Sequence, residues 1–136
     1  MTDKEPYFVY KLVPSTAPVR EPLPEQLPVS ALDQQSGFIH LSTAFQVPNT
    51  LKLFFKDEPL VYVLRIPYDS VAENLKWENP EGTVCGPRPT EGLFPPQHLY
   101  NGLKLGKDEV ESIAIWTKDD DGWDHALSQA TPWLVY

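Results

Sequence analysis

Side chains able to carry acid, base or ligand-binding chemistry gather at residues 37–43 (GFIHLST). A single imidazole, His40, interrupts an apolar run there and is followed by the hydroxyls of Ser42 and Thr43. In an extended strand His40 and Ser42 point to the same face, because successive side chains alternate. An imidazole beside a hydroxyl can hold a ribose or a phosphate, or transfer a proton. The alternative is structural: Ser42 caps the following helix and His40 is hydrogen-bonded in the interior.

A second group of candidates follows in the middle of the chain. Glu78 comes directly after Trp77, and a carboxyl group desolvated by an indole has a raised pKa that suits acid or base chemistry. An ion pair with Arg65 or Lys76 is the structural alternative for Glu78. Arg88, in a proline-rich loop, can bind a phosphate or a carboxylate through two parallel hydrogen bonds.

His98 and Tyr100 end the same proline-rich loop and share a face if the chain is extended there. For Tyr100, anchoring of the loop through its hydroxyl is the structural alternative. The histidines lack the spacing of metal ligands, so no metal site is predicted. Cys85 stands alone and becomes a nucleophile only if His98 or His40 reaches it.

Local patterns predict the elements that must position these side chains. Strands are expected where β-branched, aromatic and apolar residues run together, at 7–13, 37–41, 60–66, 75–78 and 110–117. Short helices are expected at 29–35, 47–55 and 70–75, the second with Leu51, Phe54 and Phe55 on its apolar face. Residues 60–66 are apolar enough for a central strand buried on both faces, and residues 123–136 have no assigned element. The pattern indicates an α+β domain with small antiparallel or mixed sheets.

The composition limits the class of protein. The chain has 136 residues, 41% of them hydrophobic, which is enough for a single domain, residues 1–136, with its own core. Its formal net charge of −8 argues against binding to long nucleic acid. No apolar run approaches the roughly 20 residues of a membrane span, and the N-terminus lacks the pattern of a secretory signal. With its single cysteine, we expect a cytoplasmic protein, and a nuclear location stays open.

Four motifs are similar to those of one known family, the domain of unknown function 952 family: YKLV at residues 10–13, GFIHLST at 37–43, LKWE at 75–78 and HLY at 98–100. The similarity runs from about residue 7 to residue 117 and leaves 118–136 as a C-terminal extension. The resemblance implies a fold like that of ADP-ribosyltransferases, a clan that also holds tRNA 2′-phosphotransferases. In that fold an NAD-like ligand lies in a central cleft between two small sheets. The resemblance implies no particular reaction.

The resemblance also suggests roles for single residues. The ADP-ribosyltransferase-like fold commonly has a Ser-Thr pair beside the nicotinamide ribose, and Ser42 and Thr43 stand where such a pair would. Lys11 is what the first strand offers in place of the usual Arg or His. The Glu-X-Glu spacing of those enzymes occurs at Glu109 and Glu111, but we expect Glu109 to lie in a solvated charge run.

The predicted catalytic residues are therefore His40, Glu78 and His98. The predicted substrate-binding residues are Ser42, Thr43, Lys11, Arg88 and Tyr100. Our first hypothesis is a protein with a cleft for a nucleotide-like or phosphorylated small molecule, NAD or a related nucleotide among the candidates, and with transferase chemistry as one outcome. The alternatives are a non-catalytic binding or regulatory domain, and an enzyme that uses His40 and Glu78 as a proton-transfer pair on a small metabolite.

Overall fold

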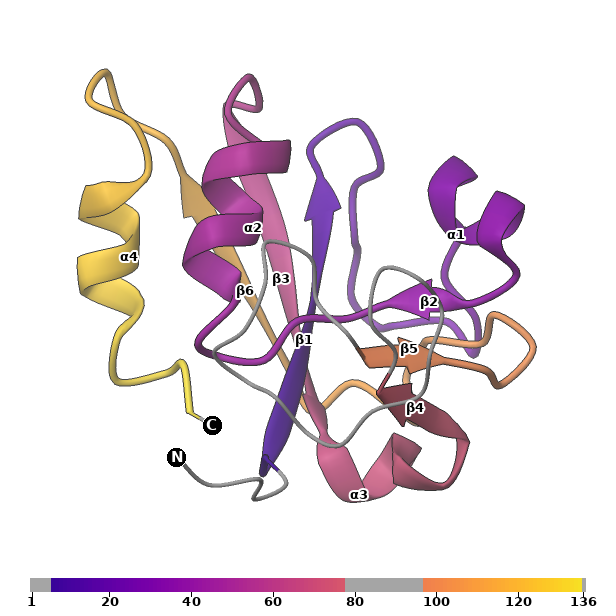
Figure 1. The fold of residues 1–136 in the computed structure, drawn as a ribbon. Helices are drawn as coiled ribbons and strands as arrows, with labels where there is room; N and C mark the ends of the chain where they lie inside the picture. Colours follow the sequence, from indigo (N-terminus) through magenta and orange to yellow (C-terminus); the bar gives the residue numbers. More distant parts are fainter. Residues whose placement is uncertain (1–5, 78–96, 136) are drawn as a thin grey trace.

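The computed structural model describes residues 6–77 and 97–135, which form two small sheets and several short helices (Figure 1). The first sheet is antiparallel, in the order β1 (Phe8–Pro14), β3 (Leu60–Pro67) and β6 (Ser112–Thr117). The second is also antiparallel, in the order β2 (Ile39–His40), β5 (Gln97–Leu99) and β4 (Leu75–Trp77). The helices are α1 (Ala31–Ser36), α2 (Val47–Phe54), α3 (Tyr68–Val71), a 3₁₀ turn at Ala72–Asn74, and α4 (Asp124–Ala130).

This content confirms the prediction of an α+β protein with small antiparallel sheets. β3 lies between β1 and β6, in the central place that its apolar sequence predicts. Val61 and Val63 on one face, and Leu64 and Ile66 on the other, are fully buried. A nearly continuous run of β-branched and leucine side chains suits this position because both faces of the strand are covered.

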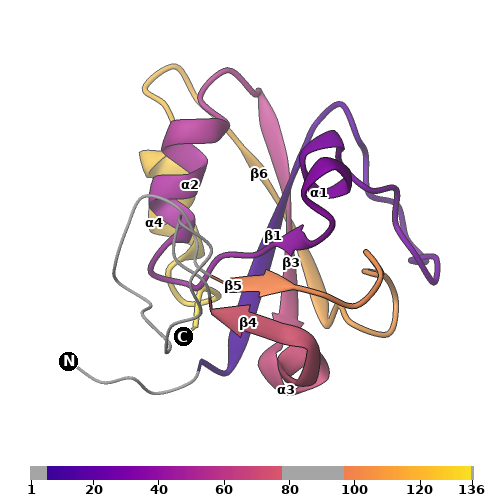
Figure 2. The same ribbon diagram turned by 45° about the vertical axis from the view of Figure 1, so that its right-hand side comes forward.

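The first sheet separates two hydrophobic cores. One core lies between the two sheets and includes Val9 and Leu99. The other lies between the first sheet and the helices α2 and α4, and includes Tyr10, Leu51 and Trp123. Figures 1 and 2 show these helices on one side of the first sheet and the second sheet on the other. Neighbouring residues of β1 therefore enter opposite cores.

Side chains of the first sheet anchor the C-terminal segment. The hydroxyl of Tyr10 donates to the carbonyl oxygen of Val135 at 2.9 Å and accepts from the amide of Val135 at 2.8 Å. Arg65 donates to the carbonyl oxygen of Trp133 at 3.0 Å, and its guanidinium lies over the Trp133 ring. The sequence pattern assigns no element to residues 123–136, but the structure forms α4 there and joins it to the second core.

Residues 39–42 connect the two sheets. Ile39 and His40 pair with β5 in the second sheet. Ser42 instead exchanges two backbone hydrogen bonds with Tyr10 of β1, at 2.7 and 2.8 Å. The stretch predicted as one strand, residues 37–41, is therefore shorter in the structure, because the chain leaves one sheet to meet the other.

Helix α2 differs from its prediction in two respects. Ser42 does not cap it, because the helix begins later and Gln46 occupies the cap position. Leu51 is fully buried as predicted, but Phe54 is 53% exposed. The buried side of the helix runs instead through Val47 and Leu51, which are one turn apart.

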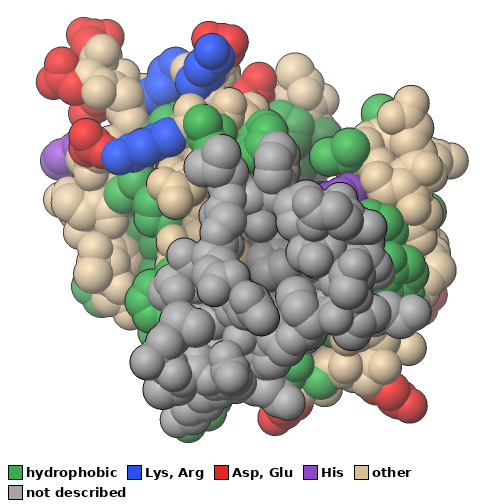
Figure 3. Space-filling model, viewed as in Figure 1, with side chains coloured by type: hydrophobic (Ala, Val, Ile, Leu, Met, Phe, Trp, Pro, Cys, Tyr) green, Lys and Arg blue, Asp and Glu red, His purple; other side chains and the backbone are tan. Residues whose placement is uncertain are grey.

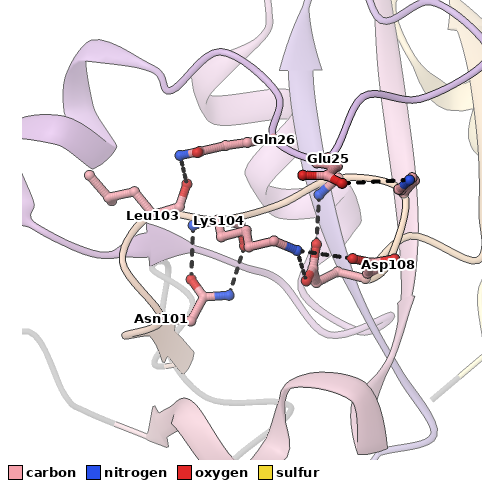
Figure 4. Close-up of polar contacts among 9 residues, drawn as sticks. Glu25, Gln26, Asn101, Leu103, Lys104 and Asp108 are labelled. Atoms are coloured by element: carbon pink, nitrogen blue, oxygen red, sulfur yellow. Dashed lines mark hydrogen bonds and ion pairs between the residues drawn. The ribbon is translucent and has the colours of Figure 1, made fainter.

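The proline-rich segment before α1 packs on the turn that follows β5 (Figure 4). The amide of Lys107 donates to the carbonyl oxygen of Pro24 at 2.9 Å. At Gly106 a Cβ atom would lie 2.2 Å from the carbonyl oxygen of Glu25, so a larger residue cannot fit without moving the backbone. The predicted irregular loop thus has a fixed place against the second half of the chain.

Glu109 lies in this contact, and the prediction that it belongs to a solvated charge run is wrong. Its carboxylate accepts from Nζ of Lys104 and from the amide of Gly106, both at 2.8 Å, and its side chain is only 12% exposed. Asn101 bonds to both the amide and the carbonyl of Lys104 in the same turn (Figure 4). Glu109 therefore stabilises the turn.

Candidate functional site

Two short strands bring four ring side chains together on the face of the second sheet that is opposite the core. His40 in β2 pairs directly with His98 in β5, and their ring centroids lie 5.2 Å apart. Phe38 stacks on His98 with centroids 4.2 Å apart and contacts Tyr100 at 5.0 Å. The side chains between them enter the core, because strand side chains alternate. We call Phe38, His40, His98 and Tyr100 the imidazole face.

A buried carboxylate, Asp33, contacts His40. Oδ1 of Asp33 lies 2.7 Å from Nδ1 of His40, and Oδ2 lies 2.6 Å from Nζ of Lys11. The Asp33 side chain is 3% exposed, against 15% for Lys11 and 26% for His40. Lys11 also donates to the carbonyl oxygen of His40 at 3.3 Å. Side chains from β1, α1 and β2 thus form one hydrogen-bonded unit.

The local sequence explains how α1 positions Asp33 next to His40. Ser30 caps the helix, and its hydroxyl accepts from the amide of Asp33 at 3.1 Å. Gly37, with a φ of 81°, ends the helix in the left-handed conformation. The chain then turns into β2, which brings His40 to the carboxylate. Our sequence analysis missed Asp33, although an acidic residue three positions after a serine cap is a recognisable signal of a helix start.

Asp33 is ionised at neutral pH. Burial acts to raise its pKa, but the hydrogen bond from His40 and the charge and hydrogen bond of Lys11 outweigh burial and hold the pKa of Asp33 below its ordinary value. An ionised carboxylate only accepts hydrogen bonds. The unit therefore fixes a negative charge directly next to His40.

The predicted site residues that the structure describes fall into two groups. Those at or beside the imidazole face are Lys11, His40, His98 and Tyr100. Ser42 and Thr43 lie in the interior, at 3% and 0% exposure. Oγ of Ser42 is 3.3 Å from Oγ1 of Thr50 in α2. Ser42 and His40 therefore have different neighbours, because the chain passes from one sheet to the other between them.

Glu78 and Arg88 fall outside the described residues, as does Cys85. Within residues 6–77 and 97–135, no group of three or more His, Cys, Asp or Glu side chains is placed to hold a metal ion. In the same part of the chain, no helix has the length and apolar character needed to cross a membrane.

Two surface hollows lie away from the imidazole face. One, of about 240 Å³, lies between the proline-rich segment and β6. The other, of about 340 Å³, lies where the turn at residues 119–122 meets α2, and charged side chains of both signs gather there (Figure 3). Lys52 and Asp124 form an exposed ion pair at 2.6 Å in that hollow. Among the described residues that line the two hollows there is no predicted site residue.

A family model described as a protein of unknown function (DUF952) matches residues 20–113 of the chain. The chain belongs to the DUF952 family. The matched stretch includes Asp33 and the whole imidazole face, whereas Lys11 precedes it and α4 follows it. The family match therefore covers most of the hydrogen-bonded unit that the structure assembles.

Solved structures of one protein resemble the DUF952 chain over most of its length. The crystal structure of protein CC0527 from Caulobacter crescentus is 27% identical, with a TM-score of 0.62, over 89% of this chain and 98% of that one. Its solution NMR structure is 28% identical, with a TM-score of 0.59, over 88% and 96%. Comparison with curated proteins gives no match. The structural similarity supports the α+β fold and brings no reaction with it.

Proposed function

We propose that this DUF952 protein binds a nucleotide-like or phosphorylated small molecule on the imidazole face and exchanges a proton with it through His40. The observation that carries the proposal is the 2.7 Å contact between Nδ1 of His40 and the buried carboxylate of Asp33. A carboxylate in this position orients the ring, which is what a general acid or base requires. The proposal places this activity in the cytoplasm.

The rings of the imidazole face suit a ligand that has both a flat ring and an anionic group. Phe38 and Tyr100 are aromatic and can pack against a base or a nicotinamide. His98 brings an imidazole nitrogen that can bind a phosphate oxygen, and His40 brings the imidazole that exchanges the proton. An NAD-like nucleotide combines the two features, so we include the ADP-ribosyltransferase-like arrangement, with its cleft between two sheets, in the proposal.

Two further residues enter the proposal from the sequence alone. Arg88 would hold the anionic group of the ligand, because a guanidinium binds phosphate through two hydrogen bonds. Glu78 would be a second acid or base in addition to His40. Both assignments depend on the sequence pattern described above.

A non-catalytic binding domain is the second candidate, and one observation favours it over a transferase. The hydroxyls that the family resemblance assigns to a ribose belong to Ser42 and Thr43, which are almost completely buried. A ligand could contact them only if the protein rearranged. An acid–base enzyme for a small metabolite needs no such rearrangement, since His40 with His98 or Glu78 would supply both proton-transfer groups.

Thermal unfolding against a ligand panel tests the proposal. The panel contains NAD, ADP-ribose, ATP and inorganic phosphate, each at millimolar concentration. A ligand that binds only the folded protein at a hundredfold excess over Kd stabilises it by about 2.7 kcal/mol and raises Tm. We expect at least one member to raise Tm of the wild-type protein, and this rise to disappear in His40→Ala and in His98→Ala.

The matched control is His125→Ala, which removes an exposed imidazole from α4. It should keep the full ligand-induced rise in Tm. The proposal is wrong if no member of the panel raises Tm, or if the rise is the same in His40→Ala and His98→Ala as in wild type. A ligand that binds but is recovered unchanged after long incubation would favour the binding domain over an enzyme.

A further inference from the structure

Both carboxylate oxygens of Asp33 are occupied by donors that come from different strands. Oδ2 accepts from Nζ of Lys11 in β1 at 2.6 Å. Oδ1 lies 2.7 Å from Nδ1 of His40 in β2 and also accepts from the backbone amide of His40 at 3.3 Å. The ammonium of Lys11 supports the ionised form of the carboxylate, so Asp33 has no hydrogen to donate. The hydrogen in the contact with His40 must then lie on Nδ1.

We propose that Asp33 is a positioning residue, whose carboxylate holds the neutral ring of His40 in the tautomer that carries its hydrogen on Nδ1. The nitrogen left without a hydrogen is Nε2. Nε2 carries a lone pair that can accept a hydrogen bond, and within residues 6–77 and 97–135 no hydrogen bond involves this atom. The functional consequence rests on the proposed function, whereas the tautomer itself does not.

This tautomer narrows the class of ligand. A lone pair on Nε2 accepts a hydrogen bond, so the ligand group against His40 must be a donor, such as a ribose hydroxyl or an amine. As a base, His40 takes the proton of that hydroxyl on Nε2. The O–H bond breaks, its electron pair stays on the ligand oxygen, and the positive charge on the ring lies next to the Asp33 carboxylate. His40 therefore begins the reaction as a base.

Nitrogen-15 NMR of the imidazole side chains tests the tautomer without any ligand. The spectra are recorded at a pH at which the ring of His40 is neutral, and His125, exposed on α4, serves as an internal reference. In the wild-type protein we expect Nδ1 of His40 to resonate as a protonated nitrogen and Nε2 as an unprotonated one. The opposite assignment in the wild-type protein would overturn the proposal, whatever the variants do.

Asp33→Asn tests the role of the carboxylate at constant shape. The ammonium of Lys11 makes the shortest contact and will take the amide oxygen of the new side chain. The amide nitrogen then faces His40 and donates to Nδ1, with loss of the weaker 3.3 Å hydrogen bond from the backbone amide of His40. Nδ1 must therefore become an acceptor, and the hydrogen must move to Nε2. We expect the two nitrogen signals of His40 to exchange their character in this variant. Unchanged signals in folded Asp33→Asn would contradict the proposal.

Lys11→Met is the matched control for a purely structural effect. It removes the other end of the same hydrogen-bonded unit but leaves the Asp33 carboxylate to accept from Nδ1. We expect it to lower Tm and to keep the wild-type tautomer of His40. The outcomes also separate the two proposals. If His40 has the predicted tautomer but no ligand binds, this inference stands and the proposed function is wrong. If a ligand binds but His40 has the reversed tautomer, the proposed function stands and this inference is wrong.

Discussion

A carboxyl group that lies between an ammonium and an imidazole resists protonation in the folded protein. The pKa of Asp33 is held below its ordinary value of 3.8 because the contacts with His40 and Lys11 outweigh the opposing effect of burial. Protonation is therefore harder in the folded chain than in the unfolded chain. It follows that the Asp33 carboxylate contributes its full stabilisation above about pH 4 and loses it as the pH falls through the lowered pKa.

We predict that Asp33→Ala lowers the free energy of unfolding by about 3 kcal/mol at pH 7, because it leaves the partly buried Lys11 ammonium without its partner. The difference from wild type should shrink as the pH falls below about 4, where the wild-type carboxylate also becomes protonated. Urea denaturation at a series of pH values measures both effects. Asp108→Ala removes an exposed partner of Lys104 and should cost no more than about 1 kcal/mol. Equal losses in the two variants would contradict this account.

At the scale of the elements, one hydroxyl joins β1 to the C-terminal segment. Tyr10→Phe leaves the amide and the carbonyl of Val135 without the partner they share. We expect a loss of about 1–2 kcal/mol and faster hydrogen exchange at the amide of Val135. Tyr62→Phe is the control, since no hydrogen bond of the Tyr62 hydroxyl occurs in the described part of the chain. Exchange at Val135 that is as slow in Tyr10→Phe as in wild type would show that the hydroxyl does not hold the segment.

The sequence predicted the features that depend on residues close together in the chain. The apolar run of β3, the glycine stop at Gly37 and the lone charge Lys11 in the first strand are all local signals. The role of Asp33 was not predicted, because it depends on contacts with His40 and Lys11, which lie on two other elements. The anchoring of the C-terminal segment was not predicted for the same reason, since Tyr10 and Val135 are 125 residues apart in the chain.

At the scale of the whole molecule, the C-terminal segment completes the second core. Trp123 and Ala130 are buried there, and Trp133 and Leu134 pack against the same cluster. The matched family region ends at residue 113, before this segment begins. The part of the chain after β6 therefore covers one side of the first sheet together with α2, although it lies outside the family match.

We predict that a chain ending at residue 118 does not fold cooperatively, because it exposes the apolar side chains of β1, β3 and α2 that the segment covers. Thermal unfolding followed by circular dichroism should show a broad transition or none, and a dye that binds exposed apolar surface should fluoresce strongly. Gln129→Ala, on the exposed side of α4, should change stability by less than about 0.5 kcal/mol. A sharp transition at the wild-type temperature in the shortened chain would contradict the prediction.

Tyr10 and Lys11 are adjacent in β1, yet one holds the C-terminal segment and the other holds Asp33 on the opposite side of the sheet. If β1 slipped by one residue against β3, the two side chains would exchange sides. An ammonium would then enter the apolar core under α2 and α4, and a phenol would face the carboxylate. Tyr10 and Lys11 therefore help to set the register of β1, because each makes its contacts only when β1 pairs with β3 in the observed register. Pairings that are shifted by one residue are disfavoured during folding.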